Sequence, residues 1–264
     1  MRHLSQVSLL CLDTREPDAA IRIMQRCLED ISFGEAVLIT QQGYQSPDAR
    51  IQVRHIAPLM SIEAYSHFMI KELGQYFYCP HVLVVQWDGY IVHPEVWTDD
   101  FLGYDYIGAP WSDRAHAVGN GGFSLRSRKL VDALADPQIN QLHPEDYAIC
   151  DFYHDLLVTQ HGIRFAPVSL ASQFSCEMIE PTGNTFGFHG IGTLHWVARG
   201  PLLQALLADI PPRARLSQPA RTLIKSLIQA GRGREALPLI KARWVTGNFK
   251  QRLDAAKLYC QACF

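Results

Sequence analysis

Apolar positions in the first 90 residues alternate between strand-like and helix-like patterns. Four short apolar runs predict β-strands: residues 7–12, 35–40, 51–56 and 81–89. Between them, apolar residues at helical spacing predict helices over residues 18–30 and 61–73, the second with Ser61 as its N-cap. Strands that alternate with helices predict a mostly parallel sheet covered by helices, the α/β class.

Polar residues follow the first and fourth predicted strands. Asp13-Thr14-Arg15 comes after the first run, and Gln86-Trp87-Asp88 ends the fourth, before Gly89. In open parallel sheets, ligands bind beyond the carboxyl ends of the strands. Both segments fit this rule, so each is a candidate for ligand binding.

The pattern changes twice further along the chain. Residues 90–200 are rich in Gly, Trp, Tyr and His and less regular, which is typical of functional loops on a scaffold. Helical spacing returns from Pro201, and Pro211-Pro212 interrupts it. We expect a catalytic domain over residues 1–210 and a helical C-terminal region over residues 211–264, with helices near residues 223–228, 236–245 and 249–259.

Composition indicates a globular protein of a reducing compartment. Apolar residues make up 48% of the 264, enough for a sizeable core, and no apolar run approaches the roughly 20 residues of a membrane helix. The seven cysteines are an odd, scattered set, so no disulfide framework is expected. We expect a cytoplasmic protein. The pair Cys260 and Cys263 has no further zinc ligand close to it in the sequence, so we interpret it as two half-buried residues of a helix.

The net charge of −2 hides an asymmetry. Residues 211–264 carry eleven Lys/Arg and two Asp/Glu, or +9, which leaves −11 for residues 1–210. Such a basic region can pack against its acidic neighbour as a structural cap, or it can bind an anionic membrane surface peripherally. Nucleic acid is not an expected partner, because no binding motif accompanies the charge.

Two segments suggest binding of a charged ligand. Asp88 ends a buried strand, where a carboxylate can hold Mg²⁺ or Mn²⁺ together with substrate phosphates, although a plain Asp-Gly turn is the simpler interpretation. The segment VGNGGFSLRS, residues 118–127, has three glycines in four positions and then a strand-like alternation. Gly121 and Gly122 allow close backbone approach to a substrate, and the alternative is a glycine-rich hairpin.

Two later segments offer acid–base groups. Pro144 precedes Glu145 and Asp146 at the predicted start of a helix, where acidic residues also complement the helix dipole. One of these carboxylates could serve as a general base. His189 lies in FGFHG, and it is either a metal ligand or a buried histidine of the core.

The order of these four segments resembles the core of GT-A glycosyltransferases. That core has a DxD-type metal motif, a glycine-rich loop, an x-E-D motif and a C-terminal histidine. The stretch QWDGYIVHPEVWTDDFLGYDYIGAPW, with VGNGGFSLRS, is more closely similar to a bacterial family of unknown function grouped with these enzymes. The resemblance covers about residues 5–195 and implies a GT-A-like nucleotide-sugar-binding fold.

The resemblance also implies roles for individual residues. Asp88 and His189 would bind the divalent cation that holds the donor diphosphate, and Asp146 would be the base beside Glu145. Gly121 and Gly122 would line the acceptor side. The nucleotide side would be lined by Asp13, Thr14, Arg15, Gln86 and Trp87. Gln86 departs from the pattern, because the first acid of DxD is an amide here.

The implied function is transfer of a sugar from a nucleotide-diphosphate donor to a hydroxyl acceptor, with Mn²⁺ or Mg²⁺ and with inversion. A glycan or a lipid-linked glycan of surface polysaccharide or glycolipid synthesis is the expected acceptor. Two alternatives stay open. A nucleotidyltransferase uses a similar sheet, but the glycine- and lysine-rich segment typical after strand one is missing. Gln86 keeps open a non-catalytic nucleotide- or carbohydrate-binding module.

Overall fold

The computed structural model describes residues 1–112 and 114–263, and the chain divides into two compact units, Met1–His189 and Gly190–Phe264. The division falls at residue 190, whereas the proline pair led us to expect it at residue 211. The helix before that pair therefore groups with the C-terminal unit. Each unit is described here by itself.

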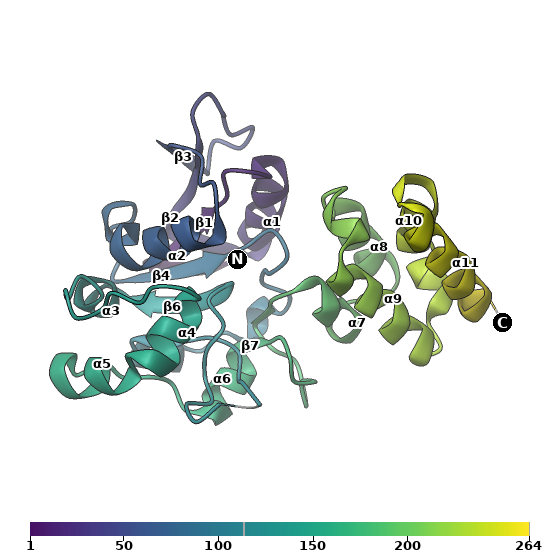
Figure 1. Ribbon diagram of the computed structural model, residues 1–264. Helices are drawn as coiled ribbons and strands as arrows, with labels where there is room; N and C mark the ends of the chain where they lie inside the picture. The colour runs from purple at the N-terminus through teal and green to yellow at the C-terminus, as the bar shows by residue number, and fades with distance from the viewer. Residues whose placement is uncertain (113, 264) are drawn as a thin grey trace. The chain divides into compact units, whose positions relative to one another are not determined.

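The first unit is built on a six-stranded sheet with strand order β3-β2-β1-β4-β6-β5 (Figure 1). The first four strands are mutually parallel, and β6 runs antiparallel to both β4 and β5. The predicted α/β class is thus confirmed. The strands are β1 (Arg2–Leu12), β2 (Ile31–Gln41), β3 (Gln52–Ile56), β4 (His81–Val85), β5 (Tyr106–Ile107) and β6 (Phe123–Ser127).

Helices cover both faces of the sheet. Leu10 of β1 and Val84 of β4 share a core cluster with Phe68 and Met69 of α2 (Ile62–Lys71). On the opposite face, helix α1 (Pro17–Asp30) packs against β1 and β2 with its apolar side. Ser61 caps α2 as predicted, because its hydroxyl accepts a hydrogen bond from the Ala64 amide at 3.2 Å.

The strand directions decide which loops meet. Since β1 and β4 are parallel neighbours, the segments after Leu12 and Val85 emerge at the same edge of the sheet. Strand β6 runs the other way, and its first residue, Phe123, pairs with Val85. The loop that precedes β6 therefore reaches the edge at which β1 and β4 end.

The rest of the first unit is made of short elements that follow β6. Its helices are α3 (Arg128–Ala133), α4 (Glu145–Tyr147), α5 (His154–His161) and α6 (Val168–Phe174), with a π-helical turn at Ala148–Phe152. A second, two-stranded parallel sheet joins β7 (Ser175–Cys176) and β8 (Gly187–Phe188).

The second unit is helical. It consists of α7 (Leu194–Val197), α8 (Gly200–Asp209), α9 (Gln218–Gln229), α10 (Leu237–Thr246) and α11 (Phe249–Cys263). The last three match the helices predicted from the sequence. No helix among residues 1–112 and 114–263 is long and apolar enough to cross a membrane. All seven cysteines are free thiols, as expected.

Several basic side chains of the second unit form hydrogen bonds or ion pairs with other residues of that unit. Arg221 forms hydrogen bonds at 2.6 and 2.8 Å with the carboxylate of Asp254, and Arg232 pairs with Glu235 at 2.9 Å. Arg243 is 4% exposed and donates to the carbonyls of Leu216 and Ser217. Part of the +9 charge is thus engaged in contacts inside this unit.

Candidate functional site

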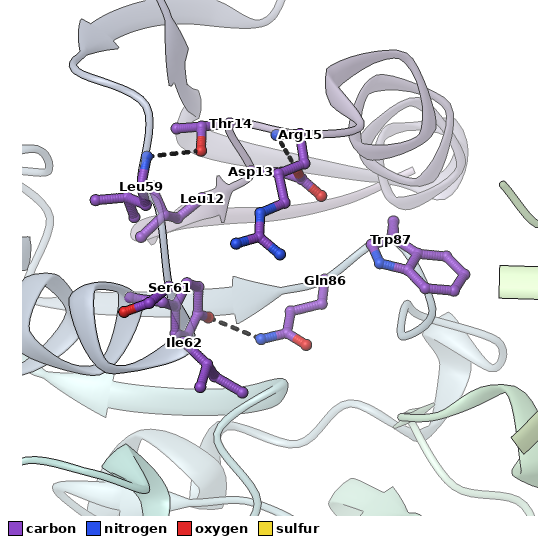
Figure 2. A pocket seen from close by; sticks show the side chains of 10 residues that line it. Leu12, Asp13, Thr14, Arg15, Leu59, Ser61, Ile62, Gln86 and Trp87 are labelled. Atoms are coloured by element: carbon purple, nitrogen blue, oxygen red, sulfur yellow. Dashed lines mark hydrogen bonds between the residues drawn. The ribbon is translucent and has the colours of Figure 1, made fainter. Parts of the chain in front are cut away.

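A pocket of about 290 Å³ lies at the carboxyl edge of the main sheet (Figure 2). The segments after β1 and β4 line it together, as the sequence led us to expect, and the start of α2 closes it. Its lining comprises Leu12, Asp13, Thr14, Arg15, Leu59, Ser61, Ile62, Tyr65, Gln86 and Trp87.

The first segment is held in place by its own polar groups. One carboxylate oxygen of Asp13 accepts hydrogen bonds from the backbone amides of Arg15 at 2.7 Å and Glu16 at 2.8 Å. The hydroxyl of Thr14 accepts from the Leu59 amide at 3.1 Å. The guanidinium of Arg15 extends into the pocket, where it donates to the Met60 carbonyl at 3.1 Å (Figure 2). Arg15 therefore places a positive charge in the cavity.

A second pocket of about 150 Å³ shares Ile62, Tyr65 and Gln86 with the first. The two cavities therefore adjoin. The rest of the lining of the second pocket includes the three carboxylates of Glu145, Asp146 and Glu177. Its other members are Ser66, Asn120, Gly121, Gly122, His143, Pro144 and His189. The glycine loop, the Glu145-Asp146 motif and His189, which are far apart in the sequence, thus meet in one cavity.

His189 connects several polar side chains. Its Nδ1 atom lies 2.9 Å from a carboxylate oxygen of Glu177, and its Nε2 atom lies 3.0 Å from Gln86 Oε1 and 3.4 Å from Asp88 Oδ1. Burial alone would lower the pKa of His189, but the negative charges of Asp88 and Glu177 raise it well above its ordinary value. The two carboxylates thus favour the charged form of the imidazole.

The small parallel sheet explains how Glu177 reaches His189. Strands β7 and β8 pair in parallel with Cys176 opposite Phe188, so the residues that follow each strand emerge side by side. These residues are Glu177 and His189. Gln86 faces the same ring because its amide nitrogen donates to the Tyr65 hydroxyl at 2.7 Å, which turns its oxygen toward the imidazole.

Gly121 and Gly122 are required by close packing. A Cβ atom added to Gly121 would overlap both carboxylate oxygens of Glu145, and one added to Gly122 would overlap the ring of His189. Asn120, at φ 65°, orients this turn: its side chain accepts from the Gly122 amide at 3.0 Å and donates to Glu177. The glycines therefore allow the loop to lie directly against the acidic motif and the histidine.

Glu145 and Asp146 have different surroundings. Arg126, which is 0% exposed, donates to Glu145, to the Ser124 hydroxyl at 3.0 Å and to the Gly121 carbonyl at 3.3 Å. The Glu145 carboxylate is therefore engaged in a buried ion pair. Burial raises the pKa of Asp146 above its ordinary value, and the charge of Glu145 raises it further, while a hydrogen bond from the Tyr147 amide opposes the change.

Three side chains of the site were not predicted from the sequence: Glu177, Asn120 and Arg126. Glu177 follows a two-residue strand, which gives no periodic signal in a sequence. Asn120 and Arg126 lie inside the glycine-rich segment of residues 118–127, in which only the glycines were expected to have a role. A fully buried arginine in a short strand requires an acidic partner, and that partner proved to be Glu145.

The aromatic residues also separate into two groups. Trp97 is buried against Phe101 and Phe186, and Tyr106 is fully buried, so neither can stack on a sugar. Trp87 is half-buried at the rim of the first pocket (Figure 2).

The fold and the site define an α/β protein with two adjoining pockets at the carboxyl edge of its sheet. The chain belongs to a family described as a protein of unknown function (DUF5672), whose model matches residues 48–189. This match covers more than half of the chain and ends at the same residue as the first structural unit. The resemblance to a family of unknown function, inferred from the sequence motifs, is thus confirmed.

Solved structures with a similar course of the backbone include two sugar transferases. The galactosyltransferase LgtC, in complex with donor and acceptor sugar analogues, is 11% identical, with a TM-score of 0.42 over 69% of this chain and 86% of its own. The mannosyltransferase PcManGT from Pyrobaculum calidifontis, in complex with GDP-Man and Mn²⁺, is 11% identical, with a TM-score of 0.42 over 98% of this chain and 81% of its own.

A third structure is that of S. aureus TarS 1–349, which is 10% identical, with a TM-score of 0.39 over 99% of this chain and 81% of its own. None of the curated proteins compared with this sequence matches it. Likenesses at this level of identity concern the path of the chain and transfer no residue roles.

Proposed function

We propose that this protein is a metal-dependent glycosyltransferase that moves a sugar from a nucleoside diphosphate to a hydroxyl group of an acceptor. The observation that carries the proposal is the pair of adjoining pockets that share Ile62, Tyr65 and Gln86. The first pocket offers the positive charge of Arg15 and the aromatic ring of Trp87, and the second offers three carboxylates, a histidine and the glycine loop. A donor and an acceptor that react at a common boundary require such a pair.

The larger pocket suits the nucleotide part of the donor. The positive charge of Arg15 lies within it and can pair with phosphate oxygens. Trp87 at the rim can stack on a base or a sugar face. Asp13 and Thr14 keep the shape of this wall through their hydrogen bonds to backbone amides, so we assign them a positioning role in donor binding.

The residues around His189 fit a divalent cation. Two oxygen atoms, Asp88 Oδ1 and Gln86 Oε1, lie 3.4 and 3.0 Å from His189 Nε2, which are separations typical of neighbouring ligands whose bonds to an ion are about 2.1 Å long. On the far side of the ring, Glu177 accepts from Nδ1, which is the usual way to orient a metal-binding histidine. The oxygen of Gln86 keeps a neutral ligand where a carboxylate is missing.

When bound, such a cation would offset the negative charge that develops on the departing diphosphate. A histidine binds a metal through its neutral imidazole, so cation binding would compete with the protonation of His189 that Asp88 and Glu177 favour. We assign Asp88 and His189 as ligands and Gln86 as a supporting oxygen donor.

Asp146 is placed to act as the base. In the proposed reaction the acceptor oxygen bonds to the anomeric carbon, the bond from that carbon to the phosphate oxygen breaks, and the hydroxyl proton passes to Asp146. The raised pKa of this carboxylate makes it a better proton acceptor. Glu145 is held by Arg126, so we propose that it fixes the loop and the base rather than accepting the proton. Gly121 and Gly122 line the second pocket on the proposed acceptor side, where they let the loop lie against Glu145 and His189. Direct attack of this kind inverts the anomeric centre.

The test is a panel of nucleotide sugars, scored for Mn²⁺-dependent binding and hydrolysis with and without acceptor glycans. Asp88→Asn and His189→Ala should each abolish metal-dependent donor binding while the protein keeps its fold by circular dichroism. Full Mn²⁺-dependent activity in either variant would remove the metal assignment. Nucleotide-sugar binding without any turnover would instead favour a non-catalytic module, and nucleotidyl transfer from a nucleoside triphosphate would favour the other alternative.

We further propose that the C-terminal unit binds an anionic membrane surface, where a lipid-linked acceptor would lie. Helices α10 and α11 enclose an apolar groove of about 840 Å³, with Trp244 and Tyr259 half-exposed along it and Lys241 in its lining. Lys257 is a further exposed cation of α11. Aromatic side chains beside lysines are typical of surfaces that lie in a membrane interface.

A further inference from the structure

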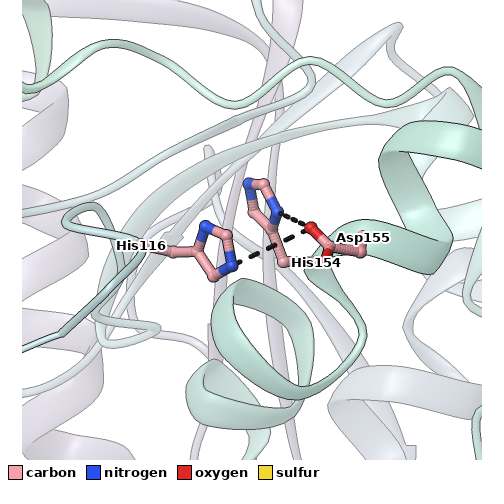
Figure 3. A group of neighbouring side chains, drawn as sticks. All are labelled: His116, His154 and Asp155. Atoms are coloured by element: carbon pink, nitrogen blue, oxygen red, sulfur yellow. Dashed lines mark hydrogen bonds and ion pairs between the residues drawn. The ribbon is translucent and has the colours of Figure 1, made fainter.

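Two histidines and an aspartate converge at a place that the proposed reaction does not use (Figure 3). His154 Nδ1 lies 3.2 Å from Asp155 Oδ1, and His116 Nε2 lies 3.9 Å from the same oxygen. One ligand atom from each residue lies within 4.8 Å of the others. Figure 3 shows both rings turned toward the carboxylate.

The two imidazoles are held by packing. Their rings stack at 3.5 Å between centroids with 17° between planes, and the ring of Phe165 lies 4.5 Å from that of His154. The side chains of His116 and His154 are 31% and 19% exposed, whereas that of Asp155 is 88% exposed. The cluster is therefore half-buried on its histidine side and open to solvent on its carboxylate side.

We propose that His116, His154 and Asp155 bind a first-row transition-metal ion such as Zn²⁺. Imidazole nitrogens together with one carboxylate are the donors that Zn²⁺ prefers in open sites, where water completes the tetrahedron. With bonds of about 2.1 Å, tetrahedral ligand atoms lie about 3.4 Å apart. The separations of 3.2 and 3.9 Å lie on either side of this value. His116 must turn partly out of the stack to direct its lone pair at the ion.

The position of the cluster indicates what the ion would do. His116 lies on the loop closed by the bridge between Pro110 and Val118, which leads directly into Asn120 and the glycine pair. His154 and Asp155 begin α5, which follows the segment that carries Asp146. An ion bound here would link the loop that precedes the glycine turn to helix α5, which follows the segment of the proposed base. We call the site formed by His116, His154 and Asp155 the clamp. Its ligands are separate from Asp88 and His189.

The clamp is tested by counting bound Zn²⁺ on the full chain, after equilibrium dialysis against Zn²⁺ alone. The terminal thiols Cys260 and Cys263 are first replaced by serine in every sample, because they could bind Zn²⁺ themselves. We expect His116→Ala and Asp155→Asn each to lose one equivalent. His161→Ala is the matched control, since His161 pairs with Asp136 at 2.8 Å without a second histidine, and it should lose none.

The count also separates this proposal from the proposed function. His189→Ala should lose any equivalent bound beside Asp88 and keep the one at His116, whatever the enzyme transfers. Unchanged Zn²⁺ binding in His116→Ala and Asp155→Asn, both in the thiol-free background, would overturn the clamp. Asp155→Asn removes an exposed carboxylate, so it tests the site even if a histidine variant folds poorly.

A second measurement tests the mechanical consequence. Arg114 is exposed on the loop that carries His116, and trypsin cleaves after arginine. Zn²⁺ should slow cleavage at Arg114 in the parent protein relative to cleavage elsewhere in the chain, and it should not do so in His116→Ala. Equal Zn²⁺ effects at Arg114 in both proteins would mean that the ion does not restrain this loop.

Discussion

Gly122→Ala is the smallest change that should disturb the proposed metal site while the rest of the fold stays intact. The added methyl group would overlap the imidazole of His189, the central side chain of the second pocket. Gly122 has no positive φ that would itself forbid alanine, so the effect comes from space alone. The ring cannot simply move away, because Asp88, Gln86 and Glu177 hold its two nitrogens.

The magnitude follows from the packing. Forcing one methyl group into a filled site costs about 1–3 kcal/mol of stability. If the overlap with His189 is the cause, removal of the ring should abolish this cost. The double variant Gly122→Ala/His189→Ala should then be less destabilised than the two single variants together, with a coupling energy of about 1–3 kcal/mol. Displacing a metal ligand should also weaken Mn²⁺-dependent donor binding by at least about 10–100-fold.

Urea unfolding of the two single variants and the double variant supplies the coupling energy, and titration of nucleotide sugar with and without Mn²⁺ supplies the affinity. Gly183→Ala is the matched control, because a methyl group there meets no atom within 4 Å. It should leave both quantities unchanged. The reasoning fails if Gly122→Ala binds donor with Mn²⁺ as the parent protein does, or if the two substitutions destabilise additively.

The remaining predictions concern the base, the buried ion pair and the basic unit. Asp146→Asn should lower turnover by a factor of about 10²–10⁴ with donor affinity unchanged. In the parent protein, turnover needs the ionised form of Asp146, whose pKa is raised, so the acid limb of the pH–rate profile should lie above the range of an ordinary aspartate. Arg126→Met should cost about 3–5 kcal/mol in denaturant unfolding, because it leaves Glu145 buried without its cation, whereas Arg126→Met/Glu145→Met should recover most of the loss. Lys241→Gln/Lys257→Gln should weaken co-sedimentation with anionic vesicles about 30-fold, from roughly 1 kcal/mol for each charge, and an unchanged affinity would leave the unit as a structural cap.

The periodic part of the fold could be predicted from the sequence. The runs that became β1, β2, β3 and β4 alternate with α1 and α2, and their pattern gave the parallel sheet. That topology in turn brought the segment at Asp13 beside the segment at Gln86, because both follow neighbouring parallel strands. The compact units divide at residue 190 and not at the proline pair, because a proline pair marks a break in a helix and not which unit that helix packs against.

The second pocket depended on contacts that no local pattern encodes. Glu177 and His189 meet because two strands of two residues each pair in parallel. Glu145 and Asp146 are adjacent in the sequence and looked equivalent, yet only Glu145 contacts Arg126. Both carboxylates line the second pocket, and the buried arginine distinguishes the one that is engaged in an ion pair.

Gln86 changes meaning once these contacts are known. As a departure from an acidic motif, it kept open a non-catalytic binding module. In the structure its amide nitrogen donates to the Tyr65 hydroxyl, and its oxygen faces His189. The Gln86 side chain therefore links Tyr65, which lines both pockets, to the histidine. A carboxylate at this position could not donate to Tyr65, and it would add a third negative charge around an imidazole already paired with Asp88 and Glu177. The amide therefore keeps an oxygen for the proposed cation while limiting the negative charge around it, so Gln86 does not argue against the proposed site.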